Sequence, residues 1–98
     1  MMKAYAIASV QMRNNSWVEQ YAAKTATLVT KHGGRYLVRG ATMEKLEGVA
    51  PLPHVMVMIE FPSMAQARAW HSDPEYAPLL KLRQGGCDTE FILVEGLS

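Results

Sequence analysis

The segment 54–61, read as HVMVMIEF, is the strongest strand signal in the chain, and it is apolar on both of its faces. Successive side chains of a strand point to opposite faces of a sheet. The expected strands at 3–10 and 89–94 also carry apolar residues at both kinds of alternating position. In a sheet with helices on one side only, the other face is expected to be polar. The sequence therefore predicts a sheet that needs cover on both faces.

The first half of the chain also carries signals for a helix and a further strand. Ser16 and Glu19 have the spacing of a capping box, so we expect a helix to begin at Trp17. Gly33 is expected to end this helix, because glycine enters the left-handed conformation without steric cost. The segment 35–41 then has the alternation of a strand.

Helical signals return after the strand at 54–61. Ser63 and Gln66 have the spacing of a second capping box, which predicts a short helix through His71. The pair Asp73-Pro74 favours a new helical start, because Asp is a good cap and Pro suits the first helical position. Gly85-Gly86 is expected to end that segment before the last strand.

The resulting order is β-α-β-β-α-(α)-β, which is typical of an α+β, ferredoxin-like sandwich with a four-stranded antiparallel sheet. Right-handed crossovers would put the strands at 3–10 and 54–61 in the centre. A chain of 98 residues suits one domain over 1–98, and such a domain buries only roughly 65% of its unfolded surface. We expect a second copy to cover the bare face. The product would be a homodimer with cavities between sheet and helices.

The composition limits the classes of binding partner that we expect for this protein. The formal charge of +1 gives no electrostatic footprint for nucleic acid or an anionic membrane, so we expect neither partner. No apolar run approaches the roughly 20 residues of a membrane-spanning helix. Cys87 is the only cysteine, which excludes an intrachain disulfide and fits a reducing cytoplasm. We therefore expect a cytoplasmic protein.

Five segments carry a resemblance to a known family. They are HGGRYLVRG at 32–40, LEG at 46–48, VMIEFPS at 57–63, AWHSDPEY at 69–76 and ILVEGL at 92–97. In this order they resemble the uncharacterised family catalogued as domain of unknown function 1330, over nearly the whole chain. The resemblance implies a dimeric α/β-barrel fold, whose relatives include cofactor-independent monooxygenases, isomerases and haem-dependent enzymes. It implies no established activity.

Charged residues on the expected strand at 35–41 are the first candidates for a site. Simple alternation puts Arg35 and Arg39 on one face, and His54 and Glu60 share a face of the next strand. If the two strands are antiparallel neighbours, Arg35 lies near Glu60 and Arg39 near His54. These charges then satisfy one another at a sheet edge, or the guanidinium groups bind the carboxylate or enolate of a ligand. Both interpretations stay open.

His32 lies where the first helix is expected to end. A cation there complements the helix dipole, and an imidazole that titrates near neutral pH could also act as a general acid or base. Glu60 is the second candidate for moving a proton. The histidines and Cys87 are scattered without paired metal-ligand spacing, so we expect no metal and no tightly bound cofactor.

Trp70 and Tyr76 flank the break between the two C-terminal helical segments. Aromatic residues at helical spacing pack in a core or line a cavity, and both interpretations apply here. Trp17 and Tyr36 are assigned to the core.

Two functions follow from these candidates. The first is the binding of a small anionic or aromatic metabolite between sheet and helices, with Arg35, Arg39, His54, Trp70 and Tyr76 as ligand-binding residues. The alternative is a cofactor-independent, monooxygenase-like or isomerase-like enzyme that transfers a proton on such a metabolite through His32 or Glu60. The sequence leaves open whether catalysis occurs.

Overall fold

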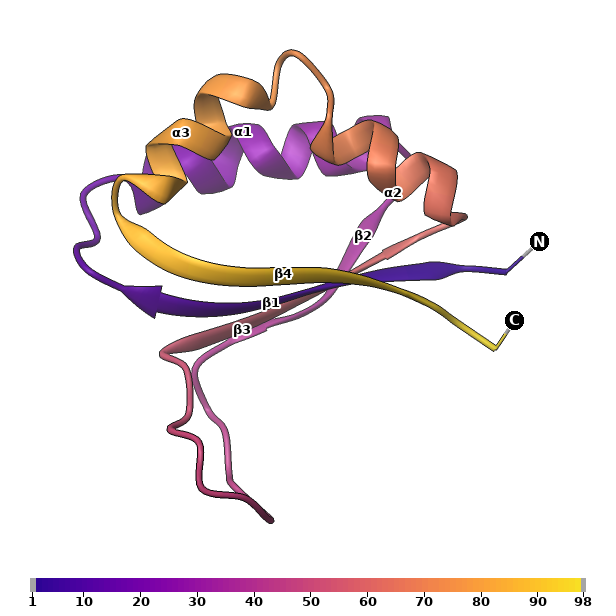
Figure 1. Ribbon diagram of the computed structural model, residues 1–98. Coiled ribbons are helices and arrows are strands. Elements are labelled where there is room, and N and C mark those ends of the chain that lie inside the picture. The colour runs from indigo at the N-terminus through magenta and orange to yellow at the C-terminus, as the bar shows by residue number, and fades with distance from the viewer. Residues whose placement is uncertain (1, 98) are drawn as a thin grey trace.

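The computed structural model describes residues 2–97 as one four-stranded sheet with three helices on one of its faces (Figure 1). The elements are β1 (Ala4–Met12), α1 (Val18–Lys31), β2 (Arg35–Gly40), β3 (Val55–Phe61), α2 (Met64–His71), α3 (Ala77–Gln84) and β4 (Cys87–Glu95). The strand order is β2-β3-β1-β4, and all neighbours are antiparallel. This confirms the expected ferredoxin-like order, with β1 and β3 in the centre. None of the helices in this range is both long and apolar enough to span a bilayer.

Of the two expected capping boxes, only the one at Ser63 caps a helix. The Ser63 hydroxyl accepts a hydrogen bond from the Gln66 backbone N–H at 3.2 Å, and α2 follows directly. The expectation for Ser16 and Glu19 is wrong. The Ser16 hydroxyl instead donates to the Asn14 side chain at 2.9 Å. It is held in a turn before the helix, so α1 begins without a side-chain cap.

The helix expected from Asp73-Pro74 begins later, at Ala77. The Asp73 carboxylate accepts a hydrogen bond from the Glu75 backbone N–H at 2.8 Å, which closes a turn ahead of the helix. Asp73 therefore caps a turn and leaves Tyr76 at the helix N-cap.

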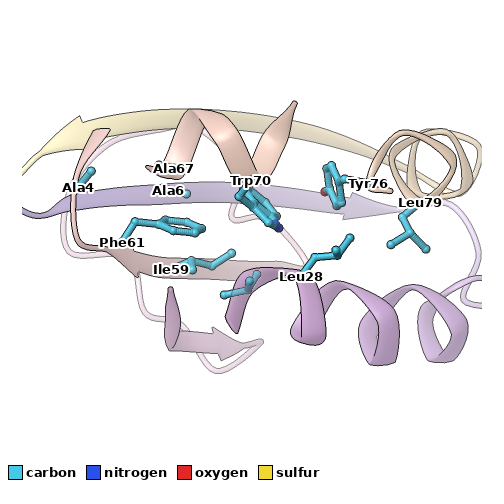
Figure 2. Close-up of a cluster of buried hydrophobic side chains, with 10 residues drawn as sticks. Ala4, Ala6, Leu28, Ile59, Phe61, Ala67, Trp70, Tyr76 and Leu79 are labelled. Carbon is cyan, nitrogen blue, oxygen red and sulfur yellow. The ribbon is translucent and has the colours of Figure 1, made fainter. Parts of the chain in front are cut away.

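The core lies between the helices and the inner face of the sheet. Small residues on β1, such as Ala4 and Ala6, are fully buried and leave room for large rings from above. Figure 2 shows Trp70 of α2 between Phe61 of β3 and Tyr76 before α3. The ring centroids of Trp70 lie 5.5 Å from Phe61 and 4.8 Å from Tyr76. Burial of this aromatic cluster fixes α2 over the sheet.

The outer face of the sheet carries exposed apolar residues that nothing covers within residues 2–97. Ile92 and Val94 on β4 are 56% and 44% exposed, and Val38 on β2 is 45% exposed. The connection between β2 and β3 extends away from the sheet on the side opposite the helices (Figure 1). Its Leu46 and Val49 are almost fully exposed. The expectation that the sheet carries apolar residues on both faces is therefore confirmed, while its cover by a second copy stays a prediction.

A β-bulge changes the faces of β2. Tyr36 pairs with Ile59, but Val38 pairs with Met58, so Leu37 is an extra residue in the ladder. Beyond the bulge, Arg39 points to the same face as Tyr36. The expectation that Arg35 and Arg39 share a face is wrong, because simple alternation does not allow for the extra residue.

Candidate functional site

A cavity of about 160 Å³ lies between α1 and the inner face of the sheet. Its walls are mainly apolar and aromatic, and they include Ala8, Val10, Trp17, Tyr21, Val57, Ile59, Trp70 and Phe91. A dry cavity of about 150 Å³ is large enough for benzene. The size of this cavity therefore suits a molecule built on one aromatic ring.

Three buried polar side-chain atoms in residues 2–97 have no hydrogen-bond partner. They are Thr25 Oγ1 on α1, Trp70 Nε1 on α2 and Arg83 Nε on α3. All three residues line this one cavity, and each is at most 6% exposed. The indole nitrogen of Trp70 is directed toward the α1 side of the core (Figure 2). Buried polar atoms are almost always partnered, so three unpartnered atoms on residues that line one cavity are an exception that needs an explanation.

Arg83 is the buried charge of the cavity. Its guanidinium lies 5.6 Å from the centroid of the Phe91 ring, which gives it a cation–π contact. Among the ion pairs of residues 2–97, none involves Arg83. The cavity walls therefore hold a positive charge without a carboxylate beside it.

Two tyrosines form a hydroxyl pair at the cavity wall. The hydroxyls of Tyr21 on α1 and Tyr76 lie 2.5 Å apart. Burial raises the pKa of Tyr21, and the neighbouring Tyr76 raises it further. The Tyr21 phenol therefore stays neutral at physiological pH and supplies no negative charge to Arg83.

The bulge in β2 brings Arg39 to the edge of the cavity. Its guanidinium lies 4.7 Å from the centroid of the Tyr36 ring, and both residues line the cavity. Arg39 is exposed as a whole, as is Val18 at the start of α1. These exposed residues mark the opening, and Arg83 lies deeper.

The candidate residues from the sequence separate into two groups. Arg39 and Trp70 line the cavity. Tyr76 is not a lining residue, but its hydroxyl is hydrogen-bonded to that of Tyr21, which is one. His32, Arg35, His54 and Glu60 are not among the lining residues. Trp17 is buried in the core and Tyr36 packs against it, as the sequence predicted, and both also line the cavity.

Arg35 and Glu60 form an ion pair on the outer face. Arg35 Nε donates to Glu60 Oε1 at 3.0 Å, as the expected strand pairing requires. The hydrogen bond from Arg35 lowers the pKa of Glu60, and Lys3 at 3.6 Å lowers it further. This pair satisfies its own charges away from the cavity.

His54 lies at the far end of the sheet from that pair. Its Nδ1 accepts a hydrogen bond from the Met12 backbone N–H at 2.7 Å. Arg39 pairs with Val57, so the expectation that Arg39 lies near His54 is wrong. The extra residue in β2 shifts Arg39 to the other face and away from the exposed His54.

His32 belongs to an ionic cluster that joins helix ends. Its Nε2 lies 2.7 Å from Asp73 Oδ2, and Lys31 Nζ contacts the same oxygen at 3.0 Å. The hydrogen bond with His32, the backbone N–H of Glu75 and Lys31 together lower the pKa of Asp73. The cluster ties the end of α1 to the turn before α3.

This cluster predicts a pH dependence of stability. A carboxyl whose pKa is lower in the folded state stabilises the fold above its unfolded pKa of about 4, and this contribution is lost as the pH falls. In Asp73→Asn, the free energy of unfolding should be lower near pH 6 and fall less steeply toward pH 3. Urea unfolding between pH 6 and pH 3 measures the free energy of unfolding and its change with pH. Glu75→Gln, which changes an exposed carboxylate on the same lysine, is the matched control. Equal slopes for Asp73→Asn and the natural sequence would contradict the account.

Within the part of the chain that the structure describes, no three His, Cys, Asp or Glu side chains are grouped so that they could hold a metal ion.

Comparison with protein families decides the relationship of the chain. Residues 3–97 match the family described as Domain of unknown function (DUF1330). The chain belongs to this family. Comparison with curated proteins gives no significant match.

Solved structures place the DUF1330 chain among ferredoxin-like proteins. A protein of unknown function from Rhodopseudomonas palustris is 19% identical with a TM-score of 0.83, covering 99% of this chain and 84% of its own. SnoaB from Streptomyces nogalater, described as a cofactor-independent oxygenase, is 13% identical with a TM-score of 0.70, covering 100% and 96%. A protein from Thermobifida fusca, described as dimeric and ferredoxin-like, is 15% identical with a TM-score of 0.55, covering 97% and 92%. At these identities the likeness shows the fold alone.

Thr25 and Arg83 were missed as site residues of this DUF1330 chain, although their spacing gave a signal. Arg83 follows Leu79 by four residues and so continues the buried side of α3. Thr25 lies between Tyr21 and Leu28 on the buried side of α1. A polar residue on the apolar stripe of a helix is the pattern that could have identified both.

Proposed function

We propose that this protein binds a small molecule built on one aromatic ring in the cavity between α1 and the sheet. The observation that carries the proposal is that three residues lining this cavity, Thr25, Trp70 and Arg83, each have a buried polar atom without a hydrogen-bond partner. Leaving a buried polar group unsatisfied costs about 1–3 kcal/mol. A ligand with an acceptor oxygen would recover part of this free energy, while its ring packs against the apolar walls.

Thermal unfolding in the presence of phenol tests the proposal. A ligand at a hundredfold excess over its Kd stabilises the native state by about 2.7 kcal/mol, so the unfolding temperature should rise with phenol concentration. Trp70→Phe keeps an aromatic ring in the wall but removes the N–H, and it should show a smaller rise. No rise at any phenol concentration, or an equal rise in Trp70→Phe, would contradict the proposed contacts.

We further propose that the protein is a homodimer in which two copies pack through their outer sheet faces. Exposed Ile92, Val94 and Val38 on that face support it, since monomers rarely leave such a patch open to water. Several structural relatives are described as dimeric. The connection between β2 and β3 extends on this side and carries exposed Leu46 and Val49, which a second copy would shield.

A cofactor-independent enzyme acting on the same ligand is the alternative function. The Tyr21–Tyr76 hydroxyl pair favours it, because a phenol at the cavity wall can donate a hydrogen bond to a reacting oxygen. Turnover of a bound phenol by the natural protein, lost in Tyr21→Phe, would support this alternative. A bound phenol that stays unchanged would support binding alone.

A further inference from the structure

We propose that the cavity selects an oxyanion, an aromatic molecule whose phenolate, enolate or carboxylate oxygen pairs with the guanidinium of Arg83. This inference rests on the proposed function and assigns the chemical class of the ligand.

The charges around the cavity point to an anion. Its lining residues include two arginines, Arg39 and Arg83, and no Asp or Glu. Arg83 is only 6% exposed and, in the described residues, forms no ion pair with a carboxylate. A buried charge is normally paired, because its removal from water is expensive. A ligand anion would supply the missing counter-charge.

The hydrogen-bonding groups of the lining residues also favour an anionic ligand. A guanidinium and an indole N–H can only donate, and the Thr25 hydroxyl can donate as well. The unpartnered atoms are therefore two obligate donors, Arg83 Nε and Trp70 Nε1, and one hydroxyl. These groups suit a ligand that accepts hydrogen bonds, whereas a cation or a donor-only ligand satisfies neither obligate donor. The neutral Tyr21 phenol cannot replace the anion.

The positions of the two arginines suggest the orientation of the ligand. Arg83 lies at the buried side with Phe91 beneath it, and Arg39 lies at the exposed edge over Tyr36. The anionic oxygen would enter first and reach Arg83, and the ring would then fill the space between α1 and the sheet. Arg39 would act at the opening, where water screens its charge.

The probes for the test are 4-nitrophenol, whose visible absorbance reports its ionisation, and its neutral methyl ether, 4-nitroanisole. In the natural protein we expect bound 4-nitrophenol to be the phenolate, with its pKa lowered by at least about one unit. We expect the phenolate to bind at least about tenfold more tightly than 4-nitroanisole. Arg83→Met should remove both effects, and Arg83→Lys, which keeps the charge, should retain a preference for the phenolate. Lys81→Met, which removes an exposed charge from the same helix, should behave like the natural protein.

The outcomes separate this inference from the proposed function. If both probes bind equally in the natural protein, or if Arg83→Met keeps the preference, the anion assignment is wrong and the cavity remains a binding site. If neither probe binds and phenol gives no stabilisation, the proposed function is wrong as well.

Discussion

Replacing Arg83 with methionine is expected to raise the free energy of unfolding of the ligand-free protein by about 1–2 kcal/mol. The guanidinium is buried against Phe91 and has no carboxylate partner in the described residues, so only uncharged neighbours such as Tyr76 offset its desolvation. Methionine has a similar length and adapts to irregular apolar space. Loss of the cation–π contact subtracts from the gain, but this contact contributes about 2 kcal/mol when it is desolvated, which is less than the several kcal/mol that burying an ion without a counter-charge costs.

Chemical denaturation of Arg83→Met beside the natural protein measures this effect. For a domain of this size, 1 kcal/mol corresponds to roughly 4–8 °C in unfolding temperature, so thermal scans should also resolve it. Lys81→Met is the control and should change stability by no more than about 0.5 kcal/mol. A loss of stability in Arg83→Met would mean that Arg83 stabilises the fold. A ligand would then not be needed to explain its burial.

Placing a charge on the outer face is expected to separate the dimer. Ile92 lies opposite Ile7 in the sheet and is 56% exposed in the single chain, so Ile92→Asp should leave the monomer folded. In a dimer packed through this face, the carboxylate would be buried without a partner. We expect the dimer Kd to rise by at least about 100-fold, which corresponds to about 3 kcal/mol.

Sedimentation velocity at micromolar concentration distinguishes the two states, and circular dichroism checks that the fold is kept. Ala23→Asp adds the same charge on the exposed side of α1 and should sediment as the natural protein does. A natural protein that is monomeric at micromolar concentration would contradict the proposal, and so would an Ile92→Asp variant that remains dimeric.

The order of elements was predictable because hydrophobic alternation and local caps determine it. The apolar run at 54–61 and the cap at Ser63 are local signals, and both have the expected outcome. The failed cap at Ser16 has a local cause too, since the side chain of Asn14 competes for the hydroxyl. Helix starts therefore depend on which of two nearby polar side chains forms the hydrogen bond.

The candidate site was less predictable than the fold, because it depends on register. One extra residue at Leu37 sends Arg39 to the cavity and leaves Arg35 on the outer face with Glu60. No composition or periodicity rule locates a bulge in a strand of six residues. Arg83 illustrates a different difficulty, since its significance lies in the absence of a nearby carboxylate, which only the packed structure shows.

The most direct test of the central claim is the indole N–H signal of Trp70 in an NMR titration with phenol. The protein has two tryptophans, and Trp17 already donates its N–H to the Asn14 carbonyl at 2.8 Å, whereas Trp70 Nε1 has no partner. In isotope-labelled protein, Trp70→Phe identifies the Trp70 signal by its loss. We expect that signal to move downfield as phenol supplies an acceptor in the cavity, while the Trp17 N–H keeps its hydrogen bond to the Asn14 carbonyl. A Trp70 signal that stays in place at saturating phenol would contradict a ligand site between α1 and the sheet.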